Sequence, residues 1–320
     1  KERMNVMQQI PVYLINGFLE SGKTLFLQDV LMGGDFDDGQ PGLLILCEEG
    51  EEEYDEKALA NMNISVLTVD DETEFSGGFL KMCEKHYRPK RIFIELNGMW
   101  NSEWLFTNEL PFSMDIVQVI TIVDGSTFPV YLNNMRSILS NLFLNTEMVI
   151  FNRCTENTDM QSFRRTVRGL NPRAMVYFED AQGNPLDPGM DVPPYDLDAD
   201  VIQIEDIDYG LWYLDAFESK DRYNGKKVRF RAKVMKTKRF ADGVFVPGRN
   251  AMTCCEDDIR FVGYLCKSEF ADQLKSRQWI WLTATVKYEY SKEYGEEGPV
   301  LYGESYELTG APEEDLVYFN

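Results

Sequence analysis

The chain has 320 residues, too many for one average domain, and 44% of them are hydrophobic, which is enough for two buried cores. Its net charge of −22 argues against nucleic acid and anionic membranes as partners, because both present negative phosphate groups. No apolar run approaches the length of a transmembrane helix, so we expect a protein that is not membrane-embedded.

The cysteines and the N-terminus indicate a compartment. The six cysteines are scattered and include no C-x-x-C pair, which is typical of free thiols in a reducing environment. The first residues lack the cationic and then apolar order of a signal peptide. Together these features predict a soluble cytoplasmic protein.

The first part of the chain alternates short apolar segments of β type with helical segments. Strands are expected at 10–15, 43–46, 63–69, 91–95, 116–123, 148–151 and 174–178, and helices at 25–32, 79–86 and 160–169. This alternation predicts an α/β fold of the P-loop NTPase type, in which a mainly parallel sheet carries helices on both faces. We assign it to a nucleotide-binding domain at 1–180.

The pattern changes after this domain. Residues 181–206 are rich in Pro, Gly and Asp, which predicts a linker. Residues 207–320 are expected to form a smaller β-rich domain. Its predicted strands lie at 227–234, 243–246, 251–255, 259–266, 279–286 and 300–308, with one helix at 269–276. This order is compatible with a five-stranded barrel of the OB type.

One octapeptide, Gly17-Phe-Leu-Glu-Ser-Gly-Lys-Thr24, fits the pattern G-x-x-x-x-G-K-[ST] between a predicted strand and a predicted helix. In such a loop the backbone N–H groups and the helix N-terminus surround phosphate oxygens. Lys23 would reach the β- and γ-phosphates, and the Thr24 hydroxyl would ligate Mg²⁺. The predicted nucleotide-binding residues of the loop are Gly17, Ser21, Gly22, Lys23 and Thr24. The alternative is a chance glycine turn before a helix.

Four further stretches follow in an order that resembles the CobW-type family of P-loop GTPases, which are proposed metallochaperones. They are Cys47–Asp55, similar to N-E-F-G-E-x-x-x-D; Ile94–Gly98, similar to I-E-T-T-G; Val123-Asp124 with Phe128, similar to V-D-x-x-x-F; and Asn171-Pro172 with Ala174, similar to N-P-x-A. The resemblance covers roughly residues 10–180.

The resemblance implies roles for three residues beyond the loop. Glu48 and Glu95 would end two strands beside the P-loop and hold Mg²⁺ directly or through water. Gly98 would leave space for the γ-phosphate. Lys23 would stabilise the charge that develops during hydrolysis, and Glu48 is the candidate for orienting the attacking water. Glu48 also belongs to an acidic run, so a solvated face is the alternative.

The departures from the family pattern concern the base and the metal. The guanine motif N-K-x-D is replaced by Asn152-Arg-Cys-Thr155. Asn152 and Arg153 remain candidates for contacting the nucleotide, but Thr155 cannot replace a carboxylate, so GTP and other nucleoside triphosphates both stay open. Glu20 brings a carboxylate near the phosphates unless it points outward. The family's G-C-x-C-C motif is missing, so no thiolate site is expected on this domain.

The C-terminal part, roughly residues 225–308, resembles a family of uncharacterised bacterial OB-like proteins associated with predicted permeases. The matching positions are Gly248, Arg249, Cys254, Cys255 and Asp258. A transition-metal site, with Zn²⁺ as the candidate ion, would use Cys254, Cys255 and Asp258. The alternative is that the two cysteines are packing residues, because successive strand residues point to opposite faces.

Two functions follow from these patterns. The first is Mg²⁺-dependent binding and slow hydrolysis of GTP or another nucleoside triphosphate, as a switch or metallochaperone that serves a metalloprotein client. The alternative is a non-catalytic relative, whose barrel acts as an interaction module associated with a permease. Single-stranded nucleic-acid binding through Trp279 and Trp281 is disfavoured by the acidity of the chain.

Overall fold

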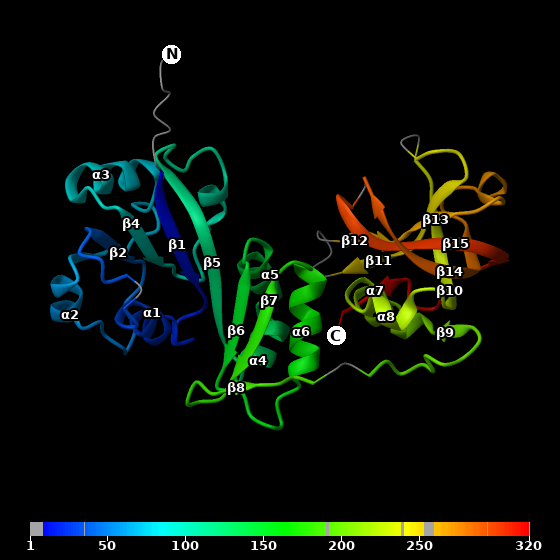
Figure 1. Ribbon diagram of the computed structural model, residues 1–320, viewed down its shortest axis with the longest axis horizontal. Coiled ribbons are helices and arrows are strands. Elements are labelled where there is room, and N and C mark those ends of the chain that lie inside the picture. Colours follow the sequence, from blue (N-terminus) through cyan, green and yellow to red (C-terminus); the bar gives the residue numbers. More distant parts are fainter. Residues whose placement is uncertain are drawn as a thin grey trace, which may run out of the picture. The chain divides into compact units, whose positions relative to one another are not determined.

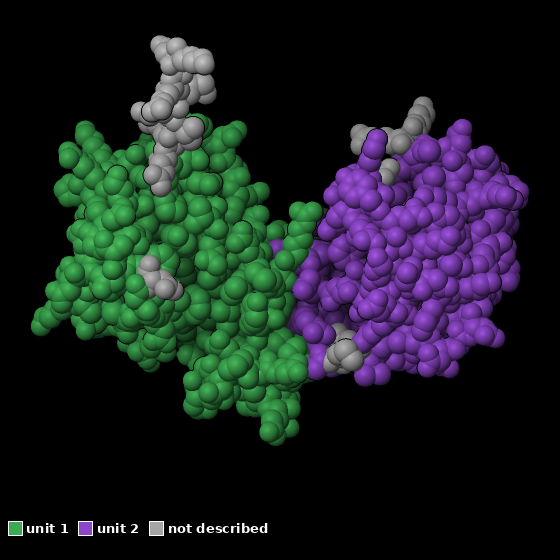
Figure 2. Space-filling model, in the orientation of Figure 1, with its two compact units in different colours: residues 1–160, 173–188 green, residues 161–172, 189–320 purple. Residues whose placement is uncertain are grey.

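The structure, a computed structural model, describes residues 9–34, 36–189, 192–237, 240–252, 259–292 and 294–319. The chain divides into two compact units, coloured separately in Figure 2. Unit 1 takes in the residues up to 160 and 173–188, and unit 2 takes in 161–172 and the residues from 189 onward.

Unit 1 is built on an eight-stranded sheet (Figure 1). Its strands are β1 (Ile10–Asn16), β2 (Gly42–Leu46), β3 (Ile64–Thr68), β4 (Arg91–Glu95), β5 (Met114–Asp124), β6 (Met148–Asn152), β7 (Met175–Glu179) and β8 (Pro185–Leu186). They lie in the order β3-β2-β4-β1-β5-β6-β7-β8, and every neighbouring pair is parallel except β7 with β8. The predicted mainly parallel sheet is confirmed.

Helices cover both faces of this sheet because side chains alternate along each strand. Val12 and Leu14 of β1 pack in one core with Leu80 of α3, whereas Ile15 packs in another with Leu27 of α1. The helices of unit 1 are α1 (Lys23–Met32), α2 (Glu56–Asn61), α3 (Gly77–Tyr87), α4 (Phe128–Asn134) and α5 (Arg136–Leu144), with a 3₁₀ helix at Glu103–Phe106. Helix α6 (Met160–Leu170) falls largely in unit 2.

Unit 2 is β-rich, as predicted. Its strands are β9 (Ile202–Ile204), β10 (Lys227–Met235), β11 (Val244–Met252), β12 (Ile259–Gly263), β13 (Leu265–Lys267), β14 (Trp279–Ser291), β15 (Glu296–Thr309) and β16 (Leu316–Val317). Pairings run from β11 through β13, β15, β14 and β10 and return to β11, so these five strands close a ring. Helices α7 (Tyr209–Glu218) and α8 (Lys220–Tyr223) precede it, and Trp212 of α7 lies in its core.

Three local predictions in unit 2 are wrong. The strand expected at 243–246 and the described part of the one expected at 251–255 belong to one continuous strand, β11, because the Pro247-Gly248 pair lies where β11 changes partner from β10 to β12. Residues 253–255 lie outside the described residues. A side chain on Gly248 would meet the Val262 carbonyl oxygen at 2.3 Å, so only glycine allows this approach. The strand expected at 259–266 divides into β12 and β13.

The helix expected at 269–276 is reduced to a 3₁₀ turn, Ala271–Gln273. The two buried apolar side chains in this stretch, Ala271 and Leu274, are three residues apart, which one turn accommodates, and the neighbouring Phe270 packs against the same core. No helix in the described part of the chain is long and apolar enough to cross a membrane.

Candidate nucleotide-binding site

The loop between β1 and α1 passes very close to neighbouring backbone. A side chain on Gly17 would meet the Ile122 carbonyl oxygen at 2.3 Å, and one on Gly22 would meet Asn152 Nδ2 at 2.7 Å. Both glycines also have positive φ, 144° and 96°, which disfavours other residues. Because α1 begins at Lys23 without a side-chain cap, the backbone N–H groups of its first turn are suited to an anion.

Lys23 is almost fully buried at the centre of this loop. Its side-chain Nζ donates to the carbonyl oxygens of Gly17, at 3.1 Å, and Phe18, at 2.8 Å. It also forms an ion pair with the Glu48 carboxylate, and the side chains of this pair are only 2% and 9% exposed. The loop carbonyl groups therefore orient the ammonium group of Lys23, and the Glu48 carboxylate neutralises its charge.

Thr24 and Glu95 form the part of the site that suits a magnesium ion. The Thr24 hydroxyl donates to Glu95 Oε1 at 2.8 Å, and the Tyr54 hydroxyl donates to Glu95 Oε2 at 2.5 Å. Glu95 ends β4 next to the P-loop and is 4% exposed. Hydroxyl and carboxylate oxygens are the donors that Mg²⁺ prefers, so Thr24 and Glu95 fit the ion that the fold family implies.

The end of β6 is tied to the P-loop across more than a hundred residues of sequence. Asn152 Nδ2 donates to the Ser21 carbonyl oxygen at 2.7 Å. Arg153 donates to the Glu20 carbonyl oxygen at 2.8 Å and to Asp124 Oδ2 at 2.6 Å. Both predicted nucleotide-contact residues therefore support the loop, through Asn152 Nδ2 and Arg153 Nη1, while the buried Asn152 Oδ1 has no hydrogen-bond partner among the residues that the structure describes.

Gly98 lies directly against the loop. A side chain there would meet the Gly17 carbonyl oxygen at 2.4 Å and the Phe18 amide nitrogen at 3.1 Å.

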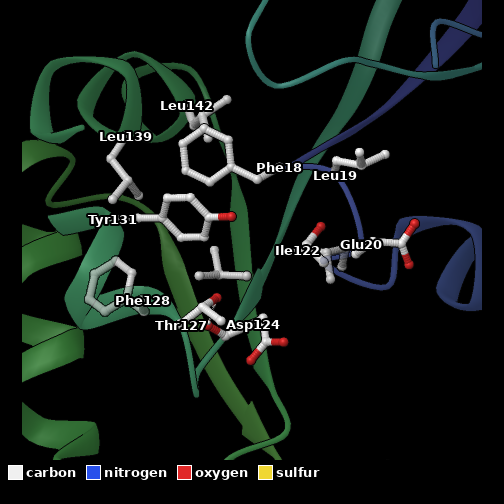
Figure 3. A pocket seen from close by; sticks show the side chains of 12 residues that line it. Phe18, Leu19, Glu20, Ile122, Asp124, Thr127, Phe128, Tyr131, Leu139 and Leu142 are labelled. Carbon is white, nitrogen blue, oxygen red and sulfur yellow. Dashed lines mark hydrogen bonds between the residues drawn. The ribbon is translucent and has the colours of Figure 1, made fainter. Parts of the chain in front are cut away.

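The Glu20 carboxylate accepts a hydrogen bond from the Glu51 amide at 2.9 Å. Figure 3 shows the Glu20 carboxylate pointing away from the apolar cavity beside Phe18 and Tyr131.

Burial and hydrogen bonding shift the pKa values of the acidic groups beside the loop in opposite directions. Burial raises the pKa of the Glu48 carboxyl, because lost hydration outweighs the attraction of Lys23. Burial acts in the same direction on Asp124, but hydrogen bonds from Ser126 and Arg153 outweigh it and lower the pKa of that carboxyl. Burial raises the pKa of the neighbouring Cys47 thiol to about 12, so this cysteine stays protonated and is a poor metal ligand.

Three cavities in the described part of the chain adjoin the loop. The largest of them, of about 420 Å³, is lined by Thr24, Tyr54 and Glu95 together with the carboxylates of the acidic run that starts at Glu48. A second, of about 100 Å³, is apolar and lies between the loop, β5 and α4 (Figure 3). The third, of about 50 Å³, is lined by Lys23 and Thr24 themselves, with Glu48 and Glu95. Among the described residues, no group of three or more His, Cys, Asp or Glu side chains has the arrangement of a metal site.

The structure brings most of the predicted site residues together at the carboxyl-terminal edge of the parallel strands. They are Gly17, Ser21, Gly22, Lys23, Thr24, Glu48, Glu95, Gly98, Asn152 and Arg153. Cys254, Cys255 and Asp258 lie outside the described residues. The sequence analysis missed two residues of this edge: Tyr54, whose hydroxyl donates to Glu95, and Gln28, whose side chain accepts from the Asp55 amide. The one sequence signal for Tyr54 is that it is an aromatic residue inside an acidic run.

A glycine loop between a central parallel strand and a helix, ending in a buried lysine and a threonine, defines the P-loop class of nucleotide-binding folds. Residues 11–178 match the family described as CobW/HypB/UreG, nucleotide-binding domain. The chain therefore belongs to this family, and the predicted resemblance is confirmed. Residues 190–319 match the DUF1980 C-terminal domain, the second family that the sequence resembles.

Solved structures with a similar fold include a zinc-bound triple mutant of the YjiA GTPase, at 21% identity and a TM-score of 0.42 over 57% of this chain and 60% of that chain. The hydrogenase maturation factor HypB from Archaeoglobus fulgidus is 14% identical, with a TM-score of 0.38 over 55% of this chain and 83% of its own. FlhF complexed with GMPPNP and Mg²⁺ is 13% identical, with a TM-score of 0.36 over 59% and 73%.

The chain thus spans only about 60% of the length of the YjiA structure. The comparison with curated proteins finds no match to this chain.

Proposed function

We propose that this protein binds GTP or another nucleoside triphosphate with Mg²⁺ and hydrolyses it slowly, as a switch of the CobW type. The observation that carries this proposal is the placement of Lys23, which two P-loop carbonyls orient beside a helix start, next to the Thr24–Glu95 pair. The backbone amides of the loop and the helix start suit an anion, and the buried ammonium group of Lys23 would bind a triphosphate there in place of the Glu48 carboxylate.

Each residue has a defined part in the chemistry. Lys23 binds the β- and γ-phosphate oxygens and stabilises the charge that develops as the terminal phosphoryl group leaves. Thr24 and Glu95 hold the magnesium, which neutralises phosphate charge when bound. Gly98 keeps the loop open by its lack of a side chain. Glu48 orients the attacking water once its carboxylate has left Lys23.

Base preference is expected to be weak. Asn152 Nδ2 and Arg153 Nη1 bind the P-loop and Asp124, and no carboxylate follows at Thr155. Because guanine is normally distinguished by a carboxylate that accepts from its N–H groups, GTP and ATP should bind with similar affinity. Calorimetric titration of both nucleotides in the presence of Mg²⁺ measures this. A clear preference for GTP would require another acceptor in the base pocket.

The test of hydrolysis is phosphate release with and without Mg²⁺. We expect turnover in the wild type and its loss in Lys23→Ala, with nucleotide affinity lowered about a hundredfold, the order expected for hydrogen bonds to a charged group. Lys57→Ala, on the exposed face of α2, is the matched control and should behave as wild type. Melting curves of both variants are needed, because Lys23→Ala leaves Glu48 buried without its partner.

A non-catalytic relative is the second candidate, and one observation favours it. The Glu48 carboxylate already binds Lys23, the group on which transition-state stabilisation depends. Nucleotide binding in the wild type without turnover above Lys23→Ala would favour this candidate over the switch.

The ring of strands in unit 2 is the proposed partner-binding part. Its order, with a parallel pair between β13 and β15, supports the OB-type barrel expected from the sequence. A metalloprotein or permease component is the client we infer for it, and Zn²⁺ at Cys254, Cys255 and Asp258 is its candidate metal. Elemental analysis tests for the metal. If the reduced, metal-free protein does not bind added Zn²⁺, the proposed zinc site is wrong. The buried free thiols support a cytoplasmic location.

A further inference from the structure

Residues 48–56, which we term the acidic segment, are fastened to the nucleotide site at four points. The Glu48 carboxylate binds Lys23, and the Glu51 amide donates to Glu20 Oε1 at 2.9 Å. The Tyr54 hydroxyl donates to Glu95 Oε2 at 2.5 Å, and the Asp55 amide donates to Gln28 Oε1 at 3.1 Å. The contacts therefore reach the P-loop, α1 and the end of β4, from one continuous stretch of chain.

Two of these contacts use the groups that a nucleotide needs. Lys23 must turn its ammonium group to the phosphates, yet its third hydrogen-bond partner is the Glu48 carboxylate. Glu95 must offer a carboxylate oxygen to Mg²⁺, yet one oxygen accepts from Thr24 and the other from Tyr54. A carboxylate on a P-loop lysine has the charge and the acceptor geometry of a phosphate oxygen.

The charge of the acidic segment makes shared occupancy unfavourable. Seven of its nine residues are Asp or Glu, and a triphosphate would bring several more negative charges to the same ammonium group. Glu48 is also largely desolvated, so its repulsion by a phosphate is less screened than at the surface.

Building on the proposed function, we propose that the acidic segment is a latch on the nucleotide site. Glu48 occupies the phosphate position on Lys23, and Tyr54 holds Glu95 back from the metal; triphosphate and Mg²⁺ displace both contacts together. Binding is thereby coupled to a movement of residues 48–56, and the affinity for nucleotide is lower than the P-loop alone would give.

The first test is Glu48→Gln, which keeps the shape of the side chain and removes its charge. The latch predicts that GMPPNP without Mg²⁺ binds the variant about tenfold more tightly than the wild type, measured by calorimetry. Asp29→Asn is the matched control, because it removes one carboxylate charge from an exposed position of α1 that lies outside the acidic segment and makes no contact with Lys23. Unchanged affinity in Asp29→Asn separates the Glu48 contact from the general effect of net charge.

The second test is Tyr54→Phe, which removes only the hydroxyl on Glu95. The latch predicts that the Mg²⁺ concentration for half-maximal GMPPNP binding falls about threefold, while affinity without Mg²⁺ stays the same. A purely structural role for Tyr54 would lower the melting temperature and leave the Mg²⁺ requirement unchanged, which would overturn its part in the latch.

The outcomes separate the latch from the proposed function. If the wild type binds GMPPNP and Glu48→Gln binds it equally or more weakly, the latch is wrong and Glu48 acts as a ligand instead. If neither protein binds GMPPNP at any Mg²⁺ concentration while both melt cooperatively, the proposed function itself is wrong.

Discussion

Single atoms decide whether the nucleotide site can form, and Gly98 is the clearest case. Its Cα faces the backbone of Gly17, so an added methyl group would lie 2.4 Å from a carbonyl oxygen that cannot rotate away. The structure relieves such a clash only by moving the P-loop, and with it the carbonyl groups that orient Lys23.

Gly98→Ala should therefore lose affinity for nucleotide and also stability, by about 1–3 kcal/mol, the cost typical of overpacking. Titration of GMPPNP with Mg²⁺ and a urea unfolding curve measure the two effects. Gly78→Ala is the control, because a side chain at that position of α3 would make only an ordinary contact, at 3.7 Å from Ser76 Oγ. Equal affinity in the two variants would contradict the close packing of Gly98.

Two buried thiols give a pH dependence whose sign is fixed by their environment. Burial raises the pKa of Cys83 to about 11 and of Cys266 to about 12. Because both values exceed the ordinary thiol pKa of 9.0, the stability that these groups contribute is complete below that pH. It is lost as pH rises toward the folded values, since only the unfolded chain ionises there.

We expect urea midpoints to fall between about pH 9 and pH 11, the interval between the unfolded and folded thiol pKa values. The fall should be smaller in Cys266→Ala than in the wild type once each is compared with its own value at pH 8. A thiol reagent at pH 8 should label both cysteines far more slowly in the native protein than in urea. Rapid native labelling of Cys266 would contradict its burial.

At the scale of elements, helix α7 was not predicted from the sequence, because its apolar residues show no helical periodicity. The sequence Tyr-Gly-Leu-Trp-Tyr-Leu-Asp-Ala-Phe-Glu is apolar on nearly every side, so it has no polar face to mark it as a helix. The tertiary structure explains this composition, because Tyr209, Trp212, Leu214 and Ala216 are all buried in unit 2.

Trp212 is the side chain by which α7 enters the core, where its ring lies 4.6 Å from that of Phe230 and 5.7 Å from that of Tyr264. Trp212→Ala should destabilise unit 2 by about 3–5 kcal/mol, as large-to-small changes in cores do. Phe217→Ala, at a 36% exposed position of the same helix, should cost much less. Thermal melting followed by near-ultraviolet circular dichroism compares the two variants.

The whole molecule has separate hydrophobic cores in its two units. Because the P-loop belongs to unit 1, GMPPNP with Mg²⁺ should raise the melting temperature of one calorimetric transition, and Trp212→Ala should lower the other. A single transition that responds to both changes would show that the units unfold together.

The net charge of the whole chain and the surroundings of Trp281 both argue against the binding of single-stranded nucleic acid. Arg229 and Arg231 lie over the ring of Trp281, at 4.7 and 4.8 Å, so its faces are already in contact with cations of the protein itself. With a net charge of −22, we expect no retention of a single-stranded oligonucleotide in filter binding at low salt. Retention would overturn this exclusion.

The sequence by itself determined the parallel strands β1 to β7 of unit 1, the helices α1 and α3, the position of the P-loop and the family to which the chain belongs, but it did not mark α2, α4, α5 or β8. These features are local: an apolar run of five residues predicts a buried strand, and the spacing of Gly17, Gly22 and Lys23 predicts a phosphate loop once a strand precedes it and a helix follows. The same local rules left Pro247-Gly248 between two predicted strands, whereas the pair lies inside β11, where it pairs with β10 and β12.

Only the tertiary structure decided which polar groups meet. Periodicity tells whether a side chain is buried, but it carries no information about its partner, and here the partners are distant in sequence. Glu48 meets Lys23, Tyr54 meets Glu95, and Asn152 reaches the P-loop at Ser21, because parallel strands bring their carboxyl ends to one edge of the sheet.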